Sequence, residues 1–263
     1  MERVVVTGAG SGLGAAFCEV LAARGAQVVA ADIDLASAQA TAERCGPRAH
    51  AVHCDVAELA AVQRLAAETE RLIGGVDLII NNAGVAVVGQ IGEVPIEDWR
   101  WIIDINIGGV VHGCHVFAPK LRAQKHGHIL NVASAAGLIS MPTMAPYNMT
   151  KAAVIALSET LFADLSSDGV GVSVLCPSFF PTSLTRSPRT STDAKLHGAA
   201  MRLLANSRWT AEGVARAALA GIEAGELYIA PQLDISLAWR LKRLAPTTFQ
   251  RLTRYAAKLM IRG

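Results

Sequence analysis

The sequence has little excess charge and no C-x-x-C cysteine pair. The first absence argues against a nucleic-acid partner, and the second against a disulfide-linked protein. The net charge is only +2, so bulk charge gives no attraction to a nucleic acid, and we expect no such partner. The cysteines, at positions 18, 45, 54, 114 and 176, are odd in number and form no C-x-x-C pair. This usage predicts free thiols in a reducing compartment, so we expect a cytoplasmic protein.

No targeting segment is visible at the start, and no charged residue occurs over residues 129–150. The chain opens with MERVVVTG, directly in an apolar strand pattern, which predicts no signal peptide. The uncharged run is long enough to span a membrane. It contains Pro142, Pro146 and several polar side chains, however, and lipid would leave their polar groups unsatisfied. We therefore expect a buried strand followed by an active-site loop.

Short apolar runs alternate with helical patterns along the 263 residues. The runs are rich in valine and isoleucine, as strands buried on both faces are, and occupy residues 3–7, 27–32, 49–55, 76–81, 128–134, 170–176 and 226–230. Helical patterns between them include 12–24, 57–73, 97–124, 147–168 and 210–224. The alternation predicts an α/β fold with a doubly wound parallel sheet of about seven strands and helices on both faces. We expect one domain over residues 1–263, with a substrate loop or lid at 183–209.

A glycine-rich turn follows the first predicted strand, in the sequence TGAGSGLG at residues 7–14. The pattern G-x-G-x-x-G fails because its third position is Leu13, and no Gly-Lys-Ser/Thr follows to make a Walker A loop. The spacing T-G-x-x-x-G-x-G fits, with Gly8, Gly12 and Gly14. Glycines between a strand and a helix let the backbone approach a pyrophosphate that the helix N-terminus holds. The alternative is a turn that only packs a helix on the sheet.

Asp32 ends the second predicted strand, 18 residues beyond Gly14. An acid at this distance is placed to hydrogen-bond the adenosine ribose, and its charge repels a 2′-phosphate. The residue before Gly12 is Ser11 rather than a basic residue, and no Arg or Lys directly follows Asp32. These features favour NAD over NADP. Asp32 could instead cap the following helix, although Asp34 is better placed for that.

Several spaced motifs together resemble the short-chain dehydrogenase/reductase family, in its compact single-domain branch. They are TGAGSGLG at 7–14, NNAG at 81–84, Asn106, Ser134 and YNMTK at 147–151, and the match extends in order over residues 3 to about 182. The resemblance implies a Rossmann-like fold and an enzyme that acts on CH–OH groups. One departure is Ser178 after Pro177, where the family usually has glycine; it changes the wall near the nicotinamide.

The resemblance assigns roles residue by residue. Asn106, Ser134, Tyr147 and Lys151 would be the catalytic set. Tyr147 would be the general acid/base, Ser134 would bind the reacting oxygen, and Asn106 would hold a water that links Lys151 to solvent. Cofactor contacts would come from Gly8, Ser11, Gly12, Leu13, Gly14, Asp32, Asp55, Val56, Asn82, Ala83, Gly84, Tyr147, Lys151, Pro177 and Thr182.

The spacing of Tyr147 and Lys151 has a physical reading of its own. Pro146 suits the first turn of a helix, and Tyr147 and Lys151 then lie at i and i+4 on one face. A free phenol has a pKa near 10, and a nearby ammonium favours the phenolate, so we expect Lys151 to lower the pKa of Tyr147. Taken singly, each of these residues has an ordinary structural explanation, such as a helix cap. Their joint occurrence at the ends of neighbouring strands favours a site.

The positions expected to line the substrate pocket are apolar: Leu138, Met141, Met144, Phe179, Phe180 and Leu184. Arg186 and Arg189 could reach in from the loop. We therefore expect an apolar secondary alcohol or its ketone as substrate. Alternatives are an NADP-dependent 3-oxoacyl-type reductase, which Asp32 argues against, and a non-catalytic dinucleotide-binding protein.

His112 and His115 lack the i, i+4 spacing and glutamate of a zinc protease, so no metal site is expected.

The helices at 97–124 and 147–168 carry more apolar residues than one sheet face requires, namely Trp101, Ile105, Val110, Phe117, Leu157, Leu161 and Phe162. With the family resemblance, they predict a homodimer or homotetramer.

The tail at 232–263 has seven cations against one acid, Asp234, so its net charge is +6 and that of the rest is −4. Its second half has the pattern of a cationic amphipathic helix. Such a helix could lie on an anionic membrane, but burial against this chain or a neighbouring subunit is the favoured alternative.

Overall fold

The computed structural model describes residues 1–181 and 207–262. Residues 182–206 and 263 lie outside the described part, and with them most of the expected 183–209 loop, Thr182, Leu184, Arg186 and Arg189. Side chains at positions 256–262 are also outside the description.

Seven parallel strands form one sheet in the order β3-β2-β1-β4-β5-β6-β7. They are β1 Arg3–Thr7, β2 Gln27–Asp32, β3 Ala49–His53, β4 Leu78–Asn81, β5 Gly127–Val132, β6 Val170–Leu175 and β7 Tyr228–Ile229. The predicted doubly wound sheet is confirmed. Several predicted strands were too long at their carboxyl ends: β5 stops before Ala133, and β3 before Cys54. These ends bend away into loops, which the apolar pattern of the sequence does not show.

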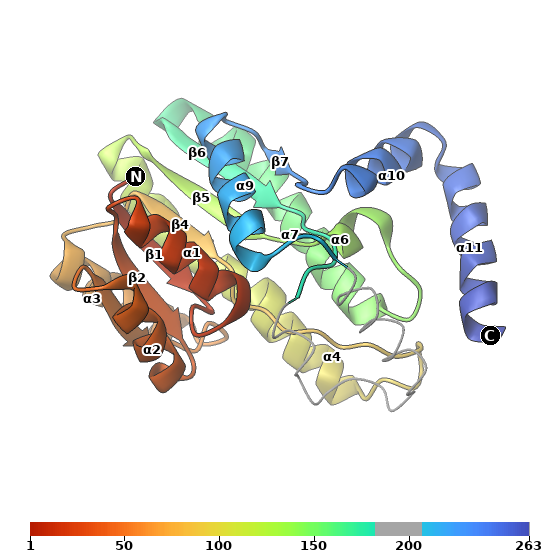
Figure 1. The fold of residues 1–263 in the computed structure, drawn as a ribbon, viewed down its shortest axis with the longest axis horizontal. Coiled ribbons are helices and arrows are strands. Elements are labelled where there is room, and N and C mark those ends of the chain that lie inside the picture. The colour runs from red at the N-terminus through yellow and green to blue at the C-terminus, as the bar shows by residue number, and fades with distance from the viewer. Residues whose placement is uncertain (182–206, 263) are drawn as a thin grey trace.

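Helices cover both faces of the sheet. One face carries α1 Gly12–Ala23, α2 Leu35–Cys45 and α9 Ala211–Glu223; the other carries α3 Leu59–Ile73, α5 Gly109–Gln124 and α7 Ala145–Asp164 (Figure 1). Alternate residues of each strand enter opposite cores: Val5 and Val29 pack with α3 and α5, whereas Val4 and Val6 pack with α1 and α9. This alternation explains why the strands read as continuous apolar runs. Asp34 caps α2 by accepting hydrogen bonds from Ala36 N and Ser37 N, as expected.

The long apolar stretch Ile96–Gln124 passes the length and composition test for a membrane span. In the fold it is a continuous helical segment of α4 Ile96–Ile103, one π-helical turn η1 Asp104–Gly108, and α5. Phe117 and Leu121 are fully buried in the core beside β4, β5 and α3. Packing against the sheet therefore accounts for its apolar composition, and a core helix of this kind is weak support for a membrane span.

Some of the residues used to predict subunit contacts belong to this same core. Val110 and Phe117 are buried inside the chain and cannot lie on a subunit surface. Trp101 packs partly buried beside Tyr147. Of the seven residues, only Phe162 is well exposed. The prediction assigned too many residues to subunit contacts. Periodicity shows that a helix has an apolar face, but it does not show whether the same chain or another subunit covers that face.

Candidate active site

The expected catalytic residues converge at the carboxyl ends of the central strands. Ser134 follows β5, Tyr147 and Lys151 lie in the first two turns of α7, and Asn106 lies in the π-helical turn η1. Lys151 Nζ donates to Val132 O at the end of β5, over 2.9 Å. Three separate segments thus meet at one edge of the sheet, as a doubly wound fold requires of its ligand crevice.

Tyr147 and Lys151 are buried side by side, with 7% and 4% of their surfaces exposed. Pro146 occupies the first turn of α7, as expected. Lys151 Nζ lies 5.7 Å from the centre of the Tyr147 ring. Burial therefore places an ammonium beside a phenol in surroundings that stabilise neither charge.

The electrostatics differ from the sequence-based expectation. Burial raises the pKa of Tyr147 to about 12, while a hydrogen bond with Ser134 opposes that rise. Burial lowers the pKa of Lys151 to about 8, and nearby Cys176 opposes the change. The pKa of Tyr147 therefore lies above its ordinary value rather than below it, because desolvation favours the neutral form of each group.

Ser134 serves two structural purposes at once. As the N-cap of α6, Ala135–Ile139, it accepts a hydrogen bond from Ala136 N over 3.1 Å. Its hydroxyl also interacts with the Tyr147 phenol. Helix capping and a catalytic role are therefore compatible, since the cap orients the side chain toward the phenol.

Asn106 joins the loop after β4 to α7. Its Oδ1 accepts from Val85 N over 2.8 Å, and its Nδ2 donates to Val85 O and to Thr150 Oγ1. A methyl group added at Gly84 would lie 3.2 Å from Asn106 Oδ1 and 3.4 Å from Lys151 Nζ. The loop therefore packs directly on the catalytic groups. The π-helical turn presents Asn106 inward, and such turns recur at functional sites.

The glycine turn has the backbone geometry that its sequence predicts. Gly8 and Gly12 have positive φ angles of 64° and 54°, which glycine adopts without strain. A methyl group at Gly14 would lie 2.1 Å from Gly8 O, so the start of α1 approaches β1 more closely than a side chain allows. Asn82 Nδ2 donates to Thr7 O and Gly8 O, which ties the turn to the end of β4. Ser11 is exposed and Leu13 buried.

Asp32 is held at the end of β2 with its carboxylate toward the turn. Its Oδ2 accepts from Gly10 N over 2.8 Å and its Oδ1 from Asp34 N over 3.0 Å. The turn, the N-terminus of α1 and this carboxylate form a cradle that fits a dinucleotide: backbone N–H groups for the pyrophosphate and an acid for the ribose.

The remaining expected cofactor residues surround the same crevice. Asp55 and Val56 follow β3, Ala83 N donates to Thr7 Oγ1, and Pro177 O accepts from Ala135 N over 2.9 Å. Ser178 N donates to Gln232 Oε1 over 3.0 Å, while the buried Gln232 Nε2 has no hydrogen-bond partner among the residues that the structure describes. His112 Nδ1 is hydrogen-bonded to Val56 O, and the described residues contain no cluster of metal-binding side chains.

The expected substrate residues separate in the structure. Leu138 packs in the core beside α7, and Phe180 packs in the core on the opposite face of the sheet. The two side chains pack in different cores, and the set of substrate-lining residues stays a prediction. Met144 does pack beside Tyr147, and Met141 and Phe179 are partly buried. Sequence reasoning missed other apolar residues in or against the cluster that contains Tyr147, namely Val85, Val87, Val94, Ile102 and Trp101.

Comparison with known proteins decides the family. A family model described as short chain dehydrogenase matches residues 2–193. The chain belongs to the short-chain dehydrogenase family. It is therefore an oxidoreductase of a family that binds a nicotinamide dinucleotide.

Relatives of this short-chain dehydrogenase include the meso-2,3-butanediol dehydrogenase of Serratia marcescens, 39% identical over 183 residues, covering 69% of this chain and 72% of that protein. A probable oxidoreductase of Mycobacterium tuberculosis, EphD, is 35% identical over 185 residues. That match covers 69% of this chain, which spans only about a third (31%) of the relative's length.

Solved structures agree with the assignment. A short-chain dehydrogenase from Burkholderia phymatum in complex with NAD is 36% identical, with a TM-score of 0.88 over 92% of each chain. One from Sphingobium yanoikuyae in complex with NADPH is 26% identical, with a TM-score of 0.78 over 95% of this chain and 96% of that one. The neighbours thus include complexes with both cofactors.

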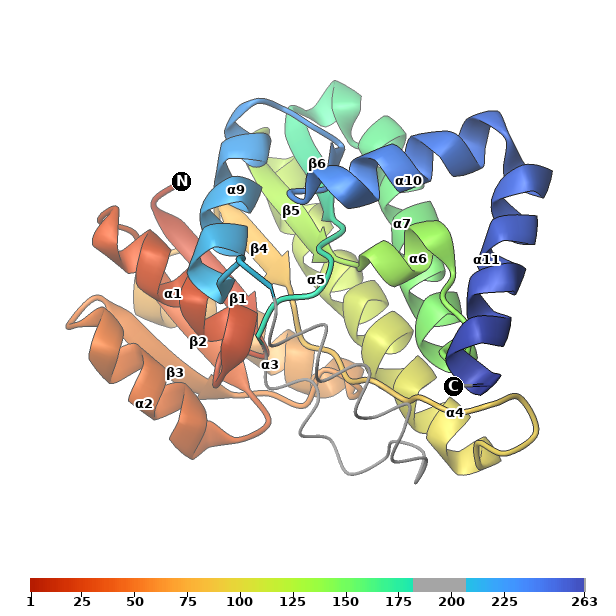
Figure 2. The same ribbon diagram turned by 45° about the vertical axis from the view of Figure 1, so that its right-hand side comes forward.

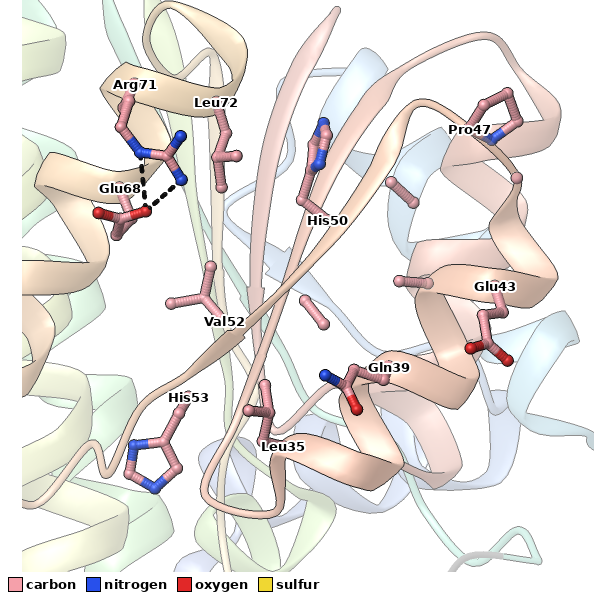
Figure 3. Close-up of a pocket in the computed structure, with 14 residues that line it drawn as sticks. Leu35, Gln39, Glu43, Pro47, His50, Val52, His53, Glu68, Arg71 and Leu72 are labelled. Carbon is pink, nitrogen blue, oxygen red and sulfur yellow. Dashed lines mark hydrogen bonds and ion pairs between the residues drawn. The ribbon is translucent and has the colours of Figure 1, made fainter.

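A groove elsewhere on this short-chain dehydrogenase lies along the edge strand β3, between α2 and α3 (Figure 3). It is lined by Leu35, Gln39, His50, Val52, His53 and Leu72 among others, with the hydrogen-bonded pair Glu68 and Arg71 on one side. None of the expected catalytic or cofactor residues lines it. The groove is therefore distinct from the candidate active site.

Proposed function

We propose that the protein is an NAD-dependent dehydrogenase that interconverts an apolar secondary alcohol and its ketone. The observation that supports this most strongly is the burial of Tyr147, Ser134 and Lys151 together, beside a turn shaped for a dinucleotide. The test is an assay of NAD reduction with a panel of secondary alcohols. Absence of turnover with every alcohol and ketone, despite cofactor binding, would favour the non-catalytic alternative.

Each catalytic residue has a proposed role that follows from its position. When bound, the nicotinamide supplies hydride chemistry. Ser134 donates a hydrogen bond to the reacting oxygen. Tyr147 gives that oxygen a proton in ketone reduction and takes one in alcohol oxidation. The raised pKa of Tyr147 keeps the phenol neutral, the form that donates a proton. In oxidation, the Lys151 ammonium beside the ring stabilises the phenolate.

The apolar character of the proposed substrate is supported by the neighbours of Tyr147. Val85, Val94, Trp101 and Met144 pack against the small apolar cluster that contains Tyr147, and none carries a charge. Burial of an apolar substrate against these side chains gives affinity without a fixed ionic partner. A small hydroxy acid would need a cation there, so acidic substrates should be turned over poorly in the same assay.

NAD is expected to bind at least tenfold more tightly than NADP, a difference of about 1.4 kcal/mol. The reason is that the Asp32 carboxylate, oriented by Gly10 N and Asp34 N, would face the 2′-phosphate of NADP. Titration of both cofactors by fluorescence quenching measures the ratio. Asp32→Asn should reduce the ratio of NAD affinity to NADP affinity, because it removes the negative charge that repels the 2′-phosphate. Equal affinities for the unmodified protein would contradict the preference and favour the NADP-dependent 3-oxoacyl-type reductase.

A homodimer or homotetramer is expected in solution. The argument now rests on the exposed apolar side chains Val111 on α5 and Met149 and Phe162 on α7, since Val110 and Phe117 belong to the core. Exposed apolar groups on these two helices would be stabilised by burial against another copy. Light scattering that shows only a 27.6 kDa species would refute this expectation.

We also propose that the protein works in the reducing cytoplasm. All five cysteines are free thiols, and four of them are buried. This usage is typical of a compartment in which disulfides do not form. Recovery of the protein solely from an extracellular fraction would contradict the proposal.

A further inference from the structure

The C-terminal arm consists of α10, Leu233–Leu244, and α11, Pro246–Arg262. One face of α10 is fixed to the body of the protein. Ile235 is buried, Trp239 packs at a tilt against Tyr228 with ring centres 4.7 Å apart, and Lys242 Nζ donates to Leu138 O over 2.6 Å. After Ala245 the chain turns, and α11 runs down one side of the molecule, apart from the sheet, with α10 as its main packing neighbour (Figures 1 and 2). The arm is thus anchored at its base and does not fold α11 over its own sheet.

The opposite face of α10 carries an exposed leucine stripe, formed by Leu233, Leu237, Leu241 and Leu244. Their exposed fractions are 72%, 55%, 45% and 85%. Spacings of four, four and three residues place them on one side of the helix, away from Ile235 and Trp239. On α11, Leu252 and Tyr255 are also well exposed. So many large apolar side chains on one short arm mark an interaction surface.

The arm is also strongly cationic. Arg240 and Arg243 are exposed on α10, and Arg251 and Arg254 on α11. Residues 232–263 carry a net charge of +6, and the remainder of the chain −4. The positive charge of the protein is therefore concentrated on the same element as its exposed leucines.

We propose that the leucine stripe and α11 bind the surface of an anionic membrane. The leucines would enter the boundary between headgroups and acyl chains, and the arginines would contact the lipid phosphates and carboxylates. The sequence favoured burial of the tail on protein, but among the described residues α11 packs mainly on α10. Pairing with the same arm of a second copy would bring two cationic surfaces together, which repel each other. An anionic bilayer complements both the charge and the apolar stripe, and the acidic body would be held away from it. This inference does not depend on the proposed dehydrogenase activity.

Co-sedimentation of the full-length protein with lipid vesicles tests the proposal. One set of vesicles is phosphatidylcholine, and the other contains a quarter phosphatidylserine. At about 0.1 M salt the anionic vesicles should bind at least about tenfold more protein, and about 1 M salt should release it because the Debye length falls from about 10 Å to about 3 Å. Equal binding to both vesicle types, or no binding to either, would overturn the proposal.

Two double variants separate the contributions. Arg251→Glu with Arg254→Glu reverses two arm charges, and Leu237→Ser with Leu241→Ser removes the middle of the stripe. Each should lower binding to anionic vesicles at least about tenfold. Their matched controls are Arg64→Glu with Lys120→Glu, at exposed positions of α3 and α5, and Ile91→Ser with Ile96→Ser, also exposed. The controls should bind as the unmodified protein does, and equal losses in a control would overturn the proposal.

Light scattering provides a second check. The proposal would also be overturned if an arm variant changed the mass of the protein in solution while vesicle binding stayed the same, since the arm would then be a subunit contact.

Discussion

Replacing Tyr147 with phenylalanine is expected to lower turnover by a factor of about 10²–10⁴. The change removes the only atom that can exchange a proton with the substrate from this position. The ring itself packs with Ala86, Val87, Ile102 and Ala136, and phenylalanine preserves that packing. Cofactor affinity and the melting temperature should therefore change little. Steady-state kinetics with the best alcohol from the panel gives the measurement.

Tyr255→Phe provides the matched control, because it removes a hydroxyl from an exposed tyrosine on α11. It should retain the turnover of the unmodified enzyme. Near-normal turnover of Tyr147→Phe would show that another group carries the proton, and the role proposed for Tyr147 would then be wrong.

Gly137→Ala is expected to reduce turnover by about 10², although Gly137 touches neither substrate nor cofactor in the proposed mechanism. In the structure, an added methyl group would lie 2.6 Å from the carbonyl carbon of Lys151 and 2.8 Å from Ala152 N. Helix α6 would have to move off the backbone of α7. That movement separates Ser134, which caps α6, from Tyr147 and Lys151 on α7. Overpacking should also destabilise the fold by about 1–3 kcal/mol.

Gly213→Ala on α9 is the control for Gly137→Ala. Its added methyl group would meet Thr210 Oγ1 at 3.4 Å, an ordinary contact at a half-buried position of α9. Stability should rise slightly, because alanine favours a helix more than glycine does. Thermal unfolding and kinetics of both variants separate loss of folding from loss of geometry. A folded Gly137→Ala enzyme with normal turnover would contradict the proposed dependence on the contact between α6 and α7.

Features set by short-range spacing were predicted well. The apolar runs located all seven strands, and the cap at Asp34 and the proline in the first turn of α7 were also identified. The positive φ angles at Gly8 and Gly12 were also expected from the local sequence, since only glycine adopts such angles freely. The catalytic assignments came from the family resemblance, and they remain predictions until kinetics test them.

The sequence by itself thus determined the layered sheet, the glycine turn, the acid at Asp32 and the pairing of Tyr147 with Lys151. The sheet follows from the alternation of strand and helix patterns, and each of the other features is a pattern within a few residues. Only the tertiary structure decided which apolar residues share a cluster with Tyr147. Val94 and Trp101 pack against that cluster, whereas Leu138 and Phe180 belong to separate cores. It also decided that desolvation dominates the pKa values of Tyr147 and Lys151, and that the leucines of α10 face outward. Apolar side chains are interchangeable in a one-dimensional pattern, and burial depends on contacts between segments far apart in the chain.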